Sequence, residues 1–243
     1  GSRQTDERLN IPAVLNNYTV TEIAAKAFYG DNFVKEIYLP ADLITIGAQA
    51  FANMSKLEYV LFNSVVENIG NEAFADNALL EKAEYPETLD GITFFGTDVF
   101  RNTPFLDDNE KEFVMLGNVL IRYKGFASEV TVPAEVSFIA PSAFSGKGEI
   151  TSVTFTDNNL KYIAEGAFSH CSGILSVTMP ASLEYVADKA FEDCSSLYSV
   201  TFGVNNGDER LSLSASAFPT GVTLVYKDTT EFDLIFRINE SET

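Results

Sequence analysis

The side chains of this chain that could do chemistry are two cysteines, one histidine and many carboxylates. Cys171 and Cys194 lie 23 residues apart, and His170 directly precedes the first of them. A zinc site needs more ligands than this group provides. Two cysteines can instead form a disulfide, or they can remain as small, buried apolar side chains. Both interpretations of the cysteines stay open here, because each depends on how the chain folds.

Sequence patterns typical of catalytic sites are absent. A single histidine cannot supply the H-E-x-x-H pair, no G-x-S-x-G segment occurs, and Ser145 to Glu149 (SGKGE) lacks the spacing of a phosphate-binding loop. Carboxylates are numerous, but proximity in sequence says nothing about the spatial separation that paired acid and base catalysis requires. We therefore expect no enzymatic activity, no cofactor and no metal ion.

The amino-acid composition limits the kinds of partner that the chain can bind. Asp and Glu number 35 against 16 Lys and Arg, so the net charge is −19 and the chain would repel nucleic acids and anionic lipids. No apolar run is long enough to span a bilayer. Hydrophobic residues make up 46% of the chain, which is enough for a continuous core. We expect a monomer that binds neither nucleic acid nor membranes.

The strongest pattern is an internal repeat. Leu160 begins LKYIAEGAFSHCSGILSVTM, and Leu183 begins the similar segment LEYVADKAFEDCSSLYSVTF. A phenylalanine after Ala or Val recurs mostly every 23–27 residues, at Phe28, Phe51, Phe74, Phe100, Phe144, Phe168, Phe191 and Phe218. This period is typical of a solenoid, whose units bury a core only by stacking. We expect the rings to form an internal spine, each contributing roughly 1.5–3 kcal/mol by burial.

Each repeat also contains two short strand patterns. An apolar-x-x-apolar segment precedes the phenylalanine, and an alternating segment rich in β-branched residues follows it. Proline, which lacks an N–H group, ends several of the second segments, at Pro40, Pro86, Pro133 and Pro180. Each unit is predicted to be a strand, a turn that carries the phenylalanine, and a second strand.

These units resemble the leucine-rich repeats of the BspA-like family, whose pattern is LxxIGxxAFxxCxxLxxVxLPxx, over about residues 20–226. The resemblance implies a β-rich, right-handed, curved repeat solenoid of short strands and single helical turns, with the LxxVxL strands on the concave face. It also implies a secreted or cell-surface bacterial protein, because some family members are adhesins for host matrix proteins. The family has cysteine as a buried filler at the positions of Cys171 and Cys194, which favours free thiols.

The ends of the chain depart from the repeat. Residues 1–19 are interpreted as a tag remnant, Gly1-Ser2, followed by a cap, and a polar start of this kind is what removal of a signal peptide would leave. Residues 227–243 are expected to cap the last repeat with the segment LIFRI.

One anchor is missing between Phe100 and Phe144. Gly117-Asn118 joins two strand-like runs there, which predicts a β-hairpin inserted at about residues 104–126, between an N-terminal and a C-terminal array. The acidic residues 107–110 before it are predicted to form an exposed loop. Calcium binding is the alternative for this loop, although it lacks the alternating ligands of an EF-hand.

Residues that bind a partner are expected among the outward positions of the second strands, since the motif itself is structural. In the N-terminal half these positions hold Glu36, Tyr38, Tyr59, Leu61, Lys82 and Glu84. Tyrosine offers a large contact area at a low entropic cost, so this mixed surface is the predicted binding site. The C-terminal half carries hydroxyl groups instead, which favour strand pairing: Thr131, Ser152, Thr154, Ser176, Thr178, Ser199 and Thr201.

The first strands add a second candidate. Phe138, Tyr162 and Tyr185 occupy equivalent positions in consecutive repeats. If exposed, they form an aromatic strip that can bind a sugar or a protein groove; if the hairpin covers them, they only support its packing.

Three hypotheses about function follow. The favoured one is a non-enzymatic, extracellular or cell-surface binding protein that recognises a host or matrix protein through the concave strands. The alternatives are a carbohydrate-binding protein that uses the aromatic strip, and a structural scaffold or spacer in a surface assembly.

Overall fold

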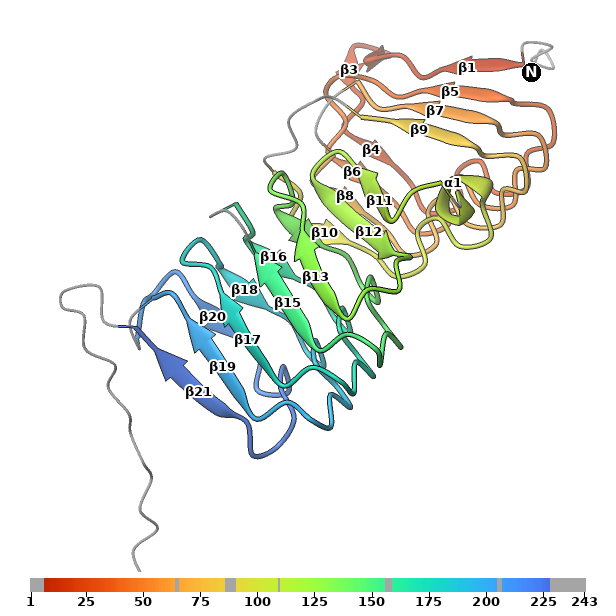
Figure 1. Ribbon diagram of the computed structural model, residues 1–243. Helices are drawn as coiled ribbons and strands as arrows, with labels where there is room; N and C mark the ends of the chain where they lie inside the picture. The colour runs from red at the N-terminus through yellow and green to blue at the C-terminus, as the bar shows by residue number, and fades with distance from the viewer. Residues whose placement is uncertain are drawn as a thin grey trace, which may run out of the picture. The chain divides into compact units, whose positions relative to one another are not determined.

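The computed structural model describes residues 7–63, 66–85, 91–108, 110–155, 159–204 and 207–227. The chain forms two compact units, Gly1–Gly125 and Phe126–Thr243 (Figure 1). The boundary between them lies at the end of the predicted hairpin insertion. Gly1-Ser2, Pro86 and, apart from Lys227, the predicted C-terminal cap lie outside the described residues.

Unit 1 contains two parallel ladders, which we name by the length of their strands. The long-strand ladder pairs β1 (Arg8–Asn10), β5 (Glu36–Tyr38), β7 (Tyr59–Leu61) and β9 (Lys82–Glu84) in this order. The short-strand ladder pairs β4 (Glu22–Ile23), β6 (Thr45–Ile46), β8 (Asn68–Ile69) and β10 (Phe94–Phe95). Strands from successive repeats therefore lie side by side, as Figure 1 shows, and the predicted repeat solenoid is confirmed.

Unit 2 also has long and short strands that pair in parallel. Its long strands form two groups: β13 (Glu129–Val132) pairs with β15 (Ser152–Phe155), and β17 (Ser176–Met179), β19 (Ser199–Phe202) and β21 (Thr223–Tyr226) pair in this order. Its short strands are β14 (Phe138–Ile139), β16 (Tyr162–Ile163), β18 (Tyr185–Val186) and β20 (Ser212–Leu213), each paired in parallel with the next. Alternation of small apolar and polar residues explains the burial, since Val177 and Val200 are buried while Ser176 and Thr178 are exposed.

The phenylalanine turns connect the repeats by a third set of backbone bonds. Phe51 N–H donates to the carbonyl of Ala73 at 2.8 Å, and Phe168 N–H donates to that of Ala190 at 2.7 Å. The phenylalanine rings of successive repeats also stack on one another. The ring centroids of Phe51 and Phe74 lie 5.3 Å apart with an interplanar angle of 11°, and those of Phe144 and Phe168 lie 4.6 Å apart with an angle of 8°. Phe28 and Phe218 are half-buried, while the spine rings at the six positions between them are buried.

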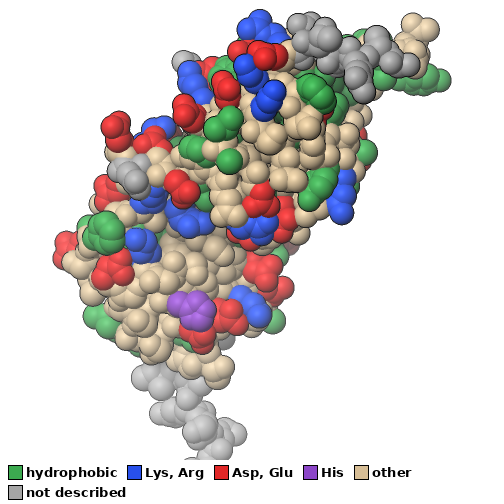
Figure 2. Space-filling view, turned by 90° about the vertical axis from the view of Figure 1, so that its right-hand side faces the viewer, with side chains coloured by type: hydrophobic (Ala, Val, Ile, Leu, Met, Phe, Trp, Pro, Cys, Tyr) green, Lys and Arg blue, Asp and Glu red, His purple; other side chains and the backbone are tan. Residues whose placement is uncertain are grey.

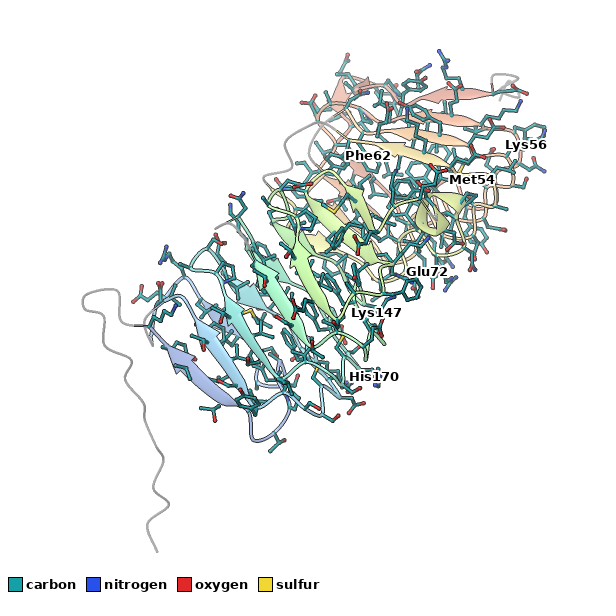
Figure 3. All side chains as sticks on the ribbon, in the orientation of Figure 1. Met54, Lys56, Phe62, Glu72, Lys147 and His170 are labelled. Carbon is teal, nitrogen blue, oxygen red and sulfur yellow. The ribbon has the colours of Figure 1, made fainter. Side chains whose placement is uncertain are left out.

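The space inside unit 1 is filled by apolar side chains from both ladders and the turns. Met54 is 0% and Phe62 is 1% exposed, and both lie inside the unit in Figure 3. The Phe62 ring packs edge-on against the Phe74 ring, with centroids 5.7 Å apart. Glycine is required where turns approach closely: a Cβ atom on Gly70 would lie 2.5 Å from the backbone nitrogen of Ala48.

In several repeats the side chain three residues after the anchor satisfies backbone groups inside the repeats. Asn77 is completely buried and bonds with three backbone groups, those of Met54, Phe51 and Phe74. Thr103 Oγ1 donates to the Phe100 carbonyl at 2.7 Å. The interior thus depends on side-chain hydrogen bonds as well as on apolar packing.

The predicted hairpin is present. β11 (Phe113–Leu116) and β12 (Val119–Tyr123) pair antiparallel around the turn at Gly117-Asn118, with one irregularity after Val114. Before it lies a helical turn that the sequence did not indicate, α1 (Pro104–Asp107), capped by Thr103. A second hairpin, β2 (Val14–Leu15) and β3 (Tyr18–Thr19), lies in the predicted N-terminal cap.

Candidate functional site

The long strands β1, β5, β7 and β9 place two columns of side chains on the outward face of unit 1. Parallel register aligns Arg8, Glu36, Tyr59 and Lys82 in one column, and Asn10, Tyr38, Leu61 and Glu84 in the next. Ile37 and Val60, which lie between these positions on the two central strands, are completely buried. We call the outward side chains of Arg8, Glu36, Tyr38, Tyr59, Lys82 and Glu84 the tyrosine face.

The first half of the tyrosine face is built around Glu36. Its Oε2 accepts a hydrogen bond from the Tyr38 hydroxyl at 3.0 Å and an ion-paired bond from Arg8 Nε at 2.8 Å. The Arg8 guanidinium also lies over the Tyr38 ring, 5.0 Å from its centroid. A cation, a ring and a carboxylate therefore hold one another in place.

The second half repeats this arrangement around Glu84. Its Oε2 accepts from the Tyr59 hydroxyl at 2.5 Å, and its Oε1 is paired with the Lys82 ammonium. Lys82 Nζ lies 5.8 Å from the centroid of the Tyr59 ring. The two halves meet at the tyrosines, whose ring centroids are 5.9 Å apart at 59°.

These contacts fix the protonation states of the tyrosine face. Partial burial, and then the bond to Glu84, raise the pKa of Tyr59 to about 12. The bonds from Lys82 and Tyr59 hold the pKa of Glu84 below its usual range, and those from Tyr38 and Arg8 do the same to Glu36. At neutral pH both phenols are protonated and both carboxylates are ionised, so each hydroxyl hydrogen points to a carboxylate.

Arg8 is the part of the tyrosine face that sequence reasoning missed. The predicted repeats are defined by the phenylalanine anchors, and no anchor precedes β1. A usable signal existed: Leu9-Asn10-Ile11-Pro12 has the apolar-x-apolar-Pro pattern of Ile37-Tyr38-Leu39-Pro40. The long-strand ladder therefore includes Arg8–Asn10, ahead of residue 20, where the predicted repeats began.

The equivalent face of unit 2 carries the predicted hydroxyl residues. Ser176 aligns with Ser199, and Thr178 aligns with Thr201, across β17 and β19. Ser176 and Thr178 are exposed, whereas Ser199 and Thr201 are half-buried. This surface consists of short side chains and has no aromatic centre. Each of its side chains therefore offers a partner a smaller contact area than the tyrosines of the tyrosine face do.

The aromatic strip of the short strands is only partly exposed. Phe138, Tyr162 and Tyr185 align in register on β14, β16 and β18. The Phe138 ring is buried and stacks on Tyr162 at 5.6 Å, while Tyr185 is 37% exposed and lies 6.2 Å from Tyr162 at 49°. The strip therefore presents mainly Tyr185 to solvent.

Both cysteines are free and completely buried. Cys171 Sγ donates to the Phe144 carbonyl and Cys194 Sγ donates to the Phe168 carbonyl, each at 3.1 Å. Burial raises the pKa of Cys171 to about 12 and that of Cys194 to about 11. They occupy the same position in their repeats as Asn77 and Thr103, so their role here is to fill space and to satisfy carbonyls.

We expect neither thiol to react in the folded protein. The thiolate is the reactive form, the raised pKa of each thiol disfavours its formation, and burial keeps reagents away from the sulfur. Native protein mixed with Ellman's reagent at pH 8 should release almost no thionitrobenzoate within minutes, whereas protein in guanidinium chloride should release two equivalents. Rapid release of even one equivalent from native protein would contradict this packing role.

Several other charged groups form ordinary surface pairs. His170 Nδ1 lies 3.2 Å from Asp193 Oδ2, and both side chains are more than half exposed. Acidic and basic side chains are interspersed on the face around His170, as Figure 2 shows. Asp108, in the predicted acidic loop, accepts from the Glu110 N–H and pairs with Lys111 at 3.3 Å. Within the described ranges, no group of three or more His, Cys, Asp and Glu is arranged to hold a metal ion.

The parallel ladders and the stacked phenylalanine turns of the described repeats define a leucine-rich repeat solenoid. The model of the BspA type leucine-rich repeat region matches residues 7–109 and 121–219 in six copies, and the chain belongs to this family. Among the residues that the structure describes, no helix is both long and apolar enough to cross a membrane.

Several solved structures are similar to this chain. A leucine-rich repeat protein from Bacteroides ovatus shares 23% identity over 90% of this chain, with a TM-score of 0.41, and this chain spans 63% of its length. The pneumococcal vaccine antigen PcpA shares 19% identity over 92% of this chain and 74% of its own, with a TM-score of 0.36. A leucine-rich cell surface protein from Faecalibacterium prausnitzii shares 16% identity over 93% of this chain and 89% of its own, with a TM-score of 0.28. A search of curated proteins gave no match.

Proposed function

We propose that this protein is a non-enzymatic binding protein of the bacterial cell surface, and that it recognises a protein of a host or of its extracellular matrix through the tyrosine face. The observation that carries the proposal is the fixed pair of Tyr38 and Tyr59, which lies between Arg8–Glu36 and Lys82–Glu84. An aromatic centre with a charged rim is the arrangement found in protein interfaces.

The tyrosine face is also organised before a partner arrives. Each tyrosine hydroxyl is bonded to a carboxylate, so the two rings lose little side-chain entropy on binding. The backbone beneath it is a continuous parallel ladder with a buried interior side. Membership of the BspA-type family supports the extracellular location, which labelling of intact source cells with an antibody to this chain tests directly.

The experiment is a binding screen of the purified chain against immobilised matrix proteins and a glycan array at physiological salt. We expect saturable binding to a protein, and we expect the Tyr38→Ala/Tyr59→Ala variant to lose at least tenfold in affinity, because two central aromatic contacts together exceed about 1.4 kcal/mol. The Ser176→Ala/Ser199→Ala variant is the matched control on unit 2 and should bind normally.

Carbohydrate binding through the aromatic strip is the second candidate, and the exposure of Tyr185 favours it. Sugars stack on open ring faces, but Phe138 and Tyr162 stack on each other, so Tyr185 provides most of the available surface. Glycan hits that disappear in a Tyr185→Ala variant and persist in Tyr38→Ala/Tyr59→Ala would favour this function. Silence in the whole screen would favour a scaffold or spacer.

A further inference from the structure

We propose that the ring of Tyr59 and the carboxylate of Glu84 form a site for a lysine or arginine side chain of the partner, and that Lys82 occupies this site until the partner displaces it. The inference rests on the proposed function, because it assigns a chemistry to the partner of the tyrosine face. It commits to a partner segment that carries a basic side chain.

The geometry around Lys82 is that of a cation bound by two attractive groups. Its ammonium group contacts Glu84 Oε1 and lies 5.8 Å from the centroid of the Tyr59 ring. Glu84 is in turn held by the Tyr59 hydroxyl at 2.5 Å, so the carboxylate keeps its position whether or not Lys82 is present. A fixed carboxylate beside an aromatic ring attracts ammonium and guanidinium groups.

The same arrangement occurs a second time on the face, and there it holds a guanidinium. Arg8 bonds to Glu36 at 2.8 Å and lies 5.0 Å from the Tyr38 ring centroid, while Tyr38 donates to the same carboxylate. Two neighbouring pairs of ring and carboxylate thus each hold a cation of this chain. The arrangement accommodates both kinds of basic side chain.

Lys82 is suited to being displaced. Its side chain is 63% exposed and Glu84 is 41% exposed, and ion pairs in such positions contribute little to stability. Lys82 lies at the end of a flexible stem, so it can turn to solvent without moving the strand. A partner lysine that arrives as part of a larger contact therefore competes with it at low cost.

The surrounding charges favour a basic partner over an acidic one. Glu58 and Glu81 are exposed on neighbouring repeats, directly before Tyr59 and Lys82 in sequence, and their backbones are hydrogen-bonded, with Glu81 N–H donating to the Glu58 carbonyl. The net charge of the whole chain is −19. An incoming cation is thus drawn to this edge of the tyrosine face, and an incoming anion is repelled.

The test is a titration of the full chain with three synthetic peptides of alternating valine and a variable residue, which is lysine, glutamine or glutamate. We expect only the lysine peptide to bind, with an affinity that falls as salt rises. Removing the competitor in Lys82→Met should make its binding about two- to fivefold tighter, and Glu84→Gln should weaken it by at least as much. Lys189→Met, which removes an equal charge from the Lys189–Glu192 pair of unit 2, is the matched control and should change nothing.

Whether Lys82→Met strengthens or weakens binding of the lysine peptide decides whether Lys82 competes for the cation site. Weaker or unchanged binding of the lysine peptide in this variant, or no preference for lysine over glutamine in the native chain, would overturn the inference. If the natural partner is lost in Tyr38→Ala/Tyr59→Ala but is indifferent to Lys82→Met and Glu84→Gln, the proposed function stands and the cation site does not. If the tyrosine variant keeps the natural partner, the proposed function fails, while the peptide titration still reports on the cation site.

Discussion

Replacing Phe74 with alanine is expected to lower the free energy of unfolding by about 3–5 kcal/mol, the range for large aromatic residues in a packed core. Phe74 is completely buried. Its ring stacks between those of Phe51 and Phe100, at 5.3 Å from each, and the Phe62 ring meets it edge-on. The substitution interrupts the spine in the middle of unit 1 and leaves a cavity that its neighbours, fixed in adjacent repeats, cannot fill.

Urea unfolding of the full chain, followed by circular dichroism because the chain has no tryptophan, measures this effect. Phe28→Ala is the matched control. Phe28 stacks only on Phe51 among the described rings and is half-buried, so its loss should cost less than half as much. Equal losses in the two variants would show that the stacked interior does not determine stability.

The second large effect is expected at a polar residue. Asn77 is 0% exposed, and its Nδ2 donates to the carbonyls of Phe51 and Phe74 at 2.8 Å each, while its Oδ1 accepts from Met54 N–H at 2.6 Å. Asn77→Leu keeps the approximate volume but leaves three buried backbone groups without partners. At about 1–3 kcal/mol for each unsatisfied group, with partial relief by relaxation, we expect a loss of about 3–4 kcal/mol.

The same urea experiment tests this prediction. Asn63→Leu is the control, because Asn63 donates one bond to the Leu39 carbonyl at 2.7 Å from an exposed position, and its loss should cost less than about 1 kcal/mol. A loss below 1 kcal/mol for Asn77→Leu as well would mean that the three backbone groups find other partners.

The repeat made most of the fold predictable. Because one phenylalanine and two alternating segments recur at nearly constant spacing, the anchors fix the register of the long and short strands without further information. Gly117-Asn118 similarly marked the hairpin, since two-residue turns have few compatible sequences. These features depend on local sequence, and each copy of the repeat supplies the same information again.

The parts that could not be predicted depend on contacts between repeats. Asn77 and Cys171 occupy equivalent positions, yet their types do not reveal which carbonyl each one meets. The pairing of Tyr59 with Glu84 joins residues 25 apart through side-chain rotamers, and rotamers do not follow from register alone. Arg8 was missed because its strand lacks the anchor by which the repeats were found.

The exposure of the aromatic strip also could not be predicted from the sequence. Register was enough to align Phe138, Tyr162 and Tyr185, but their gradient from buried to exposed depends on what packs against each ring. Sequence reasoning therefore located the two candidate surfaces, and the structure distinguishes them: the tyrosine face is held in place by ion pairs and hydrogen bonds, whereas the strip presents one exposed ring.

The measurement that tests the proposed binding site most directly is the dissociation constant of a protein partner from the screen for two double variants, compared with the native chain. Tyr38→Ala/Tyr59→Ala removes the centre of the tyrosine face, and Tyr162→Ala/Tyr185→Ala removes an equal number of rings from the strip. We predict at least a tenfold loss of affinity in the first variant and less than a twofold change in the second. A first variant that binds as tightly as the native chain, while remaining folded, would contradict the assignment of binding to the tyrosine face.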